Sequence, residues 1–187
     1  MSIYVQTQGV SMIVENVDLS QDVPRQALLD ALKEEAKNVD ITDIMAALVH
    51  MKKESIYVTA GYREKFDNAY IQSFLMRIKK IRDNNKQYEG FVNADELQEA
   101  IEILKEQQKQ VELEHDQHIH FFKIYRIITL YTTFVMDEPV HPVGMPFPGG
   151  FEIKQKEGIY YCPVKESQKN NPGAVCGICI AEQDPDV

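Results

Sequence analysis

The chain has 187 residues, of which 44% are hydrophobic and 26% charged, and a chain of this size and composition can bury a core without cross-links. Its formal net charge is −9, which argues against a general DNA- or RNA-binding role because phosphate neutralisation needs a basic face. The first residues lack the basic start and apolar stretch of a secretion signal, and the most apolar run, residues 121–136, is shorter than the ~20 residues of a membrane span. We therefore expect a cytoplasmic protein without a membrane partner, while a protein partner or a homo-oligomer remains open.

The first helix is predicted from its start signals. Residues 1–21 show no sustained periodicity and are treated as an N-terminal extension. Asp22 and Pro24 are typical of a helix start, and apolar residues then recur at helical spacing as far as Asn38. We expect this helix to open a helical domain spanning residues 22–138.

Two more helices are predicted before residue 90. The second begins at Ile41 and stops at Gly61, since glycine is a common helix terminator. Its apolar residues fall on one face, which we expect to be buried: Ile41, Ile44, Met45, Leu48 and Val49. The third helix follows Gly61 and ends in the polar stretch 83–87. Its apolar stripe consists of Phe66, Ala69, Tyr70, Phe74, Ile78 and Ile81.

The longest helical pattern runs from Ala94 to about Met136 without Gly or Pro. Its first half is largely polar, whereas residues 121–136 are apolar on every face. Either one long helix enters the core or the helix breaks near residues 116–120. Lys123 and Arg126 interrupt the apolar half, and we expect their charged ends to reach the surface.

The sequence changes character at Pro139, where frequent Pro and Gly exclude regular helix. Alternating apolar residues on either side of Gly158 predict a short hairpin that ends at Cys162. The predicted fold class is therefore mainly α: a helical bundle-like domain with a small C-terminal β-hairpin and loop module, residues 139–187, that carries the cysteines.

This module contains every cysteine of the chain and a candidate metal site. Cys176 and Cys179 form a CxxC pair, and Cys162 precedes them on the hairpin. Thiolates bind zinc and iron–sulfur clusters, and two thiolates separated by two residues can hold one ion. In a reducing compartment such a cluster favours metal over a disulfide. We predict a zinc site, with an iron–sulfur cluster as the other option.

Tetrahedral zinc needs a fourth ligand, for which His141 is the first choice because it opens the same module. The other candidates are a water molecule or one of His115, His118 and His120. The choice matters because four protein ligands are typical of a structural site, whereas three ligands and water are typical of a catalytic one.

Three functions follow from these alternatives. The first is a binding or structural protein stabilised by zinc. The second is a metalloenzyme whose metal ion has one coordination position open toward a pocket, which residues such as Glu112, His118 or Arg126 line. The third is an iron–sulfur or thiol redox protein. Three packed thiols without a metal would account for the same spacing.

The C-terminal module also resembles the tail of an archaeal family that is found chiefly in methanogens and has no assigned function. The resemblance rests on residues 141–144 (HPVG), 146–150 (PFPGG), 161–165 (YCPVK), 170–176 (NNPGAVC), Cys179 and 181–183 (AEQ). It covers about a quarter of the chain. The resemblance implies an archaeal cytoplasmic protein, and it supplies no activity, substrate or ligand.

Overall fold

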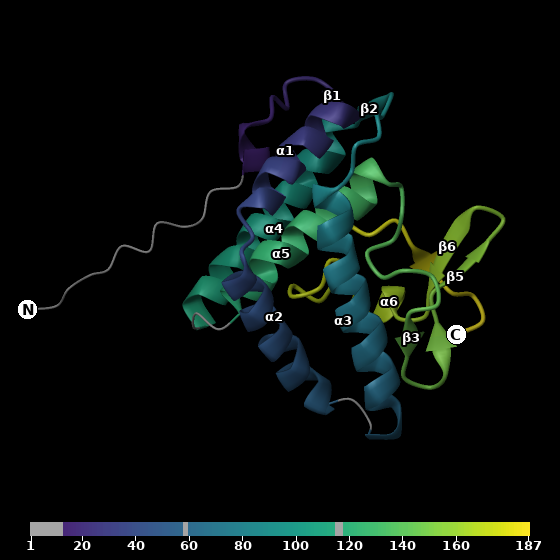
Figure 1. Ribbon diagram of the computed structural model, residues 1–187. Helices are drawn as coiled ribbons and strands as arrows, with labels where there is room; N and C mark the ends of the chain where they lie inside the picture. The colour runs from purple at the N-terminus through teal and green to yellow at the C-terminus, as the bar shows by residue number, and fades with distance from the viewer. Residues whose placement is uncertain (1–12, 58–59, 115–117) are drawn as a thin grey trace, which may run out of the picture.

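A computed structural model describes residues 13–57, 60–114 and 118–187, and the architecture is mainly α, as predicted (Figure 1). The helices are η1 (Ile13–Asn16), α1 (Arg25–Lys37), α2 (Ile41–Glu54), η2 (Ser55–Tyr57), α3 (Ala60–Arg82), α4 (Ala94–Glu114), α5 (Ile119–Leu130), η3 (Tyr131–Val135) and α6 (Lys165–Gln168). The strands are β1 (Val23–Pro24), β2 (Phe91–Val92), β3 (Pro146–Phe147), β4 (Phe151–Glu152), β5 (Lys154–Lys156), β6 (Ile159–Cys162) and β7 (Glu182–Gln183). None of the described helices is long and apolar enough to cross a bilayer.

Helix α5 forms the centre of the helical body. It packs against α1, α2, α3 and α4, so other helices cover most of its circumference. This explains why its sequence is apolar on every face, since an all-round hydrophobic helix must be buried. Its largest fully buried side chains are Ile124, Ile127 and Leu130.

The predicted first helix is confirmed, but the second differs in two ways. Pro24 and Asn38 flank α1 as expected. The predicted stop at Gly61 is wrong, because α2 ends at Glu54 and Gly61 lies inside α3. The expected buried face of α2 is also wrong in part: Ile41, Met45 and Val49 are exposed. The helix instead turns Ala47 and Met51 into the core.

The long helical pattern after residue 93 is broken, as one of the two alternatives predicted. Helix α4 ends at Glu114 and α5 begins at Ile119. The expectation that Arg126 reaches the surface is wrong, since this residue is only 3% exposed. Its Nη1 donates to Gln108 Oε1 at 2.7 Å, and its Nη2 lies 4.0 Å from Glu35 Oε2. A buried cation requires such partners.

The C-terminal module packs on the helical body beside α3 (Figure 1). The predicted hairpin turns at Gly158 and pairs β5 with β6 in antiparallel register, Lys154 opposite Tyr161. Strand β7 then adds to β6 in parallel, Cys162 opposite Gln183. Val140, Val175 and Ile178 join the main helical core. A second cluster of Met145, Ile153, Cys162 and Ala181 packs against Phe66, Ala69 and Tyr70 of α3.

Candidate functional site

The four residues predicted to bind a metal line one cavity of about 180 Å³, which we call the thiol cavity. They reach it from three separate segments. Cys162 stands at the end of β6, and Cys176 and Cys179 belong to the turn before β7. His141 follows the π-helical end of α5. Three polar residues, Tyr125, Lys165 and Gln168, also line the cavity. The rest of the lining is apolar: Pro139, Val140, Phe147, Ile153, Val164, Ala174, Val175 and Ala181.

The CxxC turn is held by hydrogen bonds that do not involve its sulfur atoms. The Cys179 N–H donates to the Val175 carbonyl at 2.9 Å, closing a helix-like turn around Cys176. Lys165 Nζ donates to the Cys179 carbonyl at 2.7 Å and also to the Cys176 carbonyl. One ammonium group therefore holds both cysteines of the pair through their backbone carbonyls.

The thiols differ in their surroundings. Burial raises the pKa of Cys162 and of Cys176. At Cys162 the backbone N–H of Val164 partly offsets this effect, as do the charge and N–H of Lys165, and at Cys176 the charge of Lys165 does so. Both thiols are therefore protonated at neutral pH. Cys179 has a different contact: its Sγ accepts a hydrogen bond from the Val140 N–H at 3.4 Å. Amide donors to sulfur are a common feature around thiolate ligands because they spread the negative charge.

His141 brings a neutral imidazole to the cavity. The residue is half-buried, but its ring is surrounded by the Tyr70 and Phe147 rings, with centroids 6.1 and 5.7 Å away. This desolvation, together with the positive charge of Arg77, lowers the pKa of His141 to about 4. At neutral pH the ring is thus in the unprotonated form that metals require.

The cavity is not shaped as a closed coordination sphere. Among residues 13–57, 60–114 and 118–187, no three His, Cys, Asp or Glu side chains lie close enough together to hold an ion. The backbone therefore brings the four side chains to one space, whereas their side-chain atoms do not converge on a point.

The alternative fourth ligands among the histidines lie elsewhere or outside the described residues. His118 Nδ1 is 2.8 Å from His50 Nδ1 on α2, and His120 Nδ1 is 2.7 Å from Asp43 Oδ1. His115 lies outside the described residues. The expected pocket lining of Glu112, His118 and Arg126 is wrong as well, because none of these residues lines the thiol cavity.

Sequence reasoning missed Lys165 and Tyr125 as members of this site. Lys165 carries a usable signal, since it lies three residues after Cys162, where a cation can reach the CxxC carbonyls. The sequence gives no such signal for Tyr125, because it is one of many apolar or aromatic residues in a helix that is apolar on every face. Burial raises the pKa of Tyr125, and the neighbouring Tyr70, Cys176 and Cys179 add to the effect.

Comparisons with known proteins match almost the whole chain. A family model described as an uncharacterised protein conserved in archaea, DUF2115, matches residues 24–184. A UPF0305 protein of Methanothermobacter thermautotrophicus is 42% identical over 160 residues, covering 86% of this chain and 96% of the relative. A UPF0305 protein of Methanococcus maripaludis is 30% identical over 158 residues, covering 81% and 91%. No solved structure gives a significant match.

Proposed function

This chain belongs to the DUF2115 family of archaeal proteins, and we propose that it binds one zinc ion in the thiol cavity as a structural centre of its C-terminal module. The ligands are Cys162, Cys176, Cys179 and His141. The supporting observation is that residues from three segments, up to 38 positions apart in the chain, line a single small cavity. A Cys₃His set is a known complement for tetrahedral structural zinc.

The charges around the cavity suit such an ion. Three thiolates, one neutral imidazole and Zn²⁺ carry a net charge of −1, by simple addition of formal charges. The ammonium of Lys165 stands against the carbonyls of Cys176 and Cys179 and can balance that charge. Arg77, whose Nη2 donates to the Pro139 carbonyl at 3.1 Å, places a second cation near His141. Metal-ligating cysteines commonly have such outer partners.

The structural role follows from what the ligands join. Cys162 ends the hairpin, and His141 lies in the connection from η3 to β3. The CxxC turn and the residue before it contribute Ile178 and Val175 to the main core. An ion that links these three segments would hold the module on the helices. Binding energy of this kind is folding energy, because the unfolded chain offers no preformed site.

A second candidate is an open metal site with three thiolates and a bound water. It is supported by the volume of about 180 Å³, which exceeds the space that one ion needs, and by the phenol of Tyr125 on the cavity wall. An iron–sulfur cluster is the third possibility. We propose a cytoplasmic location with these sites, because free thiols persist in reducing compartments.

The test is metal content after purification without air. We expect about one zinc per chain and a colourless protein, whereas iron with visible colour would indicate a cluster. Replacing zinc by Co²⁺ should give thiolate charge-transfer absorption that reports the number of sulfur ligands. Cys176→Ser and Cys179→Ser should each lose the metal.

Matched histidine variants identify the fourth ligand. His141→Gln should weaken zinc binding at least tenfold, consistent with removal of one ligand. His118→Gln removes a histidine outside the cavity and should retain full metal content. A wild-type protein that takes up neither zinc nor cobalt near stoichiometry would overturn the proposal, as would full zinc uptake by the triple Cys→Ser variant. Equal zinc affinity in His141→Gln and wild type would favour the open site.

A further inference from the structure

Two histidines outside the thiol cavity meet where α2 packs on the start of α5. His50 lies in α2, and His118 is the residue immediately before α5. Their Nδ1 atoms are 2.8 Å apart, although the two residues are 68 positions apart in the chain. Neither residue lines the thiol cavity, so we treat them as a separate feature and call them the histidine pair.

The two imidazole rings of the histidine pair do not point straight at each other. Their centroids are 4.3 Å apart and their planes are nearly perpendicular, at 88°. A linear hydrogen bond between the same nitrogens would separate the centroids by about 5 Å, because each ring nitrogen lies about 1.1 Å from its ring centre. At least one ring is therefore tilted well away from the line that joins the nitrogens. A proton shared between them explains their short separation but not this tilt, since hydrogen bonds weaken steeply when they bend.

Two tilted rings can direct their lone pairs to one point. Rings that lean equally to one side, with these nitrogen and centroid separations, aim both Nδ1 lone pairs at a point about 2.1 Å from each nitrogen, and metal–imidazole bonds are about 2.0–2.1 Å long. The angle between the two nitrogens at that point is close to a right angle and well below the tetrahedral angle. Neighbouring positions of a square-planar or octahedral ion have this angle, so the pair suits Ni²⁺ or Cu²⁺ better than tetrahedral zinc.

Packing holds both histidines in place. The His50 ring lies against the Phe121 ring, with centroids 4.8 Å apart, and Phe121 stacks on Phe74 of α3 at 5.5 Å. The His118 carbonyl accepts the Phe122 N–H at 2.9 Å, which fixes its backbone at the start of α5. The side chain of His118 makes no capping hydrogen bond there. Ligand side chains that are already ordered lower the entropic cost of binding an ion.

The histidine pair is also open to solvent. His50 and His118 are both half-buried, so an ion can reach them from water. No group of three His, Cys, Asp or Glu ligands forms anywhere in the part of the chain that the structure describes. An ion held by the pair therefore keeps several coordination positions for water or a small ligand. Open positions of this kind are typical of a reactive or exchangeable metal site and not of a closed structural one.

We propose that His50 and His118 chelate one divalent transition-metal ion, with Ni²⁺ as the representative, through their two Nδ1 atoms. Each ring then carries its proton on Nε2 and gives the Nδ1 lone pair to the ion. Water fills the remaining positions. The site uses nitrogen ligands on the helical body, so it is independent of the sulfur ligands proposed for zinc in the thiol cavity.

The location of the ion is tested with Ni²⁺ added to the full-length protein. Calorimetry measures affinity and stoichiometry, and paramagnetic broadening of backbone NMR signals locates the ion. We expect Ni²⁺ to bind and to broaden signals of residues 47–53 and 118–122, whereas Mg²⁺, which prefers oxygen ligands, should not bind there. No Ni²⁺ binding, or broadening confined to residues 162–179 around the thiol cavity, would overturn the proposal. Two protein ligands hold an ion more weakly than four, so zinc retained through purification still reports the thiol cavity.

Two variants remove one ligand each. His50→Gln and His118→Gln should each weaken Ni²⁺ binding at the pair at least tenfold, the loss expected when a coordinating group is removed. Ni²⁺ should raise the melting temperature of wild type, because it binds the folded state, and should raise that of the two variants much less. Comparing each variant with and without Ni²⁺ separates loss of the ligand from any change in the fold itself.

His120→Gln is the matched control. It removes a histidine from the same end of α5, but His120 Nδ1 lies 2.7 Å from Asp43 Oδ1 and does not face the pair. This variant should bind Ni²⁺ within about twofold of wild type and keep the signal broadening at residues 47–53. If His50→Gln and His118→Gln bind Ni²⁺ like wild type, or if His120→Gln weakens binding as much as they do, the histidine pair is not a metal site.

Discussion

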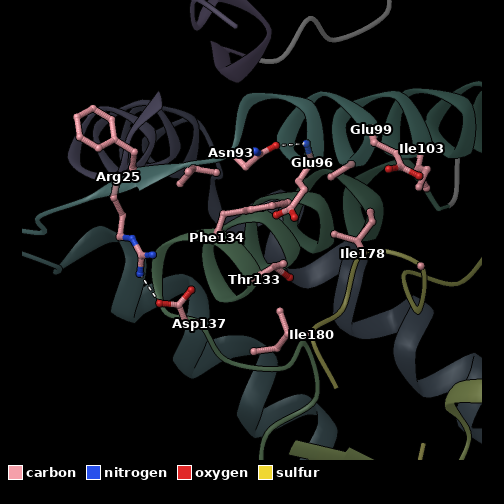
Figure 2. A pocket seen from close by; sticks show the side chains of 14 residues that line it. Arg25, Asn93, Glu96, Glu99, Ile103, Thr133, Phe134, Asp137, Ile178 and Ile180 are labelled. Atoms are coloured by element: carbon pink, nitrogen blue, oxygen red, sulfur yellow. Dashed lines mark hydrogen bonds and ion pairs between the residues drawn. The ribbon is translucent and has the colours of Figure 1, made fainter. Parts of the chain in front are cut away.

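Cys176 and Gly177 are consecutive residues that line different cavities: Cys176 lines the thiol cavity, and Gly177 lines a cavity of about 390 Å³ beside α4 and η3 (Figure 2). The CxxC turn is therefore a shared wall, with Cys176 and Cys179 on one side and Gly177, Ile178 and Ile180 on the other. A change on one side of so short a segment must be felt on the other. The first two predictions below test this wall and the Lys165 contacts that hold it, and the third tests the buried carboxylate of Asp43 on α2.

Gly177→Ala should be tolerated or slightly stabilising. The backbone of Gly177 is not left-handed, and an added Cβ would meet only Ile103 Cδ1 at 3.9 Å, an ordinary contact. Reduced freedom of the unfolded chain then favours alanine by about 0.4 to 1 kcal/mol. Gly158→Ala is the matched comparison, because Gly158 has a φ of +86° in the β5–β6 turn and alanine there is strained by about 1 to 2 kcal/mol. Urea unfolding of both variants measures this difference, and a loss of stability in Gly177→Ala contradicts the prediction.

Lys165→Met should destabilise the CxxC turn. Methionine keeps most of the apolar stem of the side chain but cannot donate to the carbonyls of Cys176 and Cys179. We expect a loss of about 1.5 to 3 kcal/mol in the free energy of unfolding, the range for hydrogen bonds to charged groups. Lys169→Met is the control, since the partner of Lys169 among the described residues is the exposed Glu166, and it should cost less than about 0.5 kcal/mol. Similar losses in the two variants would mean that Lys165 does not support the turn.

Asp43→Asn should change how stability depends on acid. Asp43 accepts hydrogen bonds from Lys123 Nζ at 2.5 Å and from His120 Nδ1 at 2.7 Å, and its own N–H donates to Asp40 Oδ1 at 2.9 Å. Burial alone raises the pKa of Asp43, but the bonds from Lys123 and His120 outweigh it, and the pKa lies below the ordinary aspartate value.

The sign of the pH dependence follows. A carboxyl with a lowered folded-state pKa stabilises the protein above the ordinary pKa of about 4 and loses that contribution as the pH falls toward the folded-state value. Wild type should therefore be more stable than Asp43→Asn by roughly 1 to 2 kcal/mol at pH 7, because Lys123 and His120 are partly screened by solvent. The gap should be constant down to about pH 5 and shrink below pH 4. A gap that grows on acidification would contradict this, and chemical unfolding at several pH values measures it.

Local spacing in the sequence was enough to predict several features of this fold. The start of α1 near Pro24 and its end at Asn38 follow from backbone rules that act within one turn. The hairpin that ends at Cys162 is equally local, because the left-handed Gly158 marks its turn. The spacing of Cys176 and Cys179 also placed the two thiols on one short turn before any fold was known.

Contacts between distant segments were decided only by the tertiary structure. Apolar periodicity shows that α2 has apolar faces, but the position of α5 decides that Ala47 and Met51 are covered and Met45 is not. Arg126 is buried because α4 supplies Gln108.

Packing between distant segments also decides which histidine lies near the cysteines. His141 shares a cavity with three cysteines, while His118 turns to His50. Side-chain spacing specifies which residues share a face, whereas the partner that covers the face comes from packing between elements far apart in the chain.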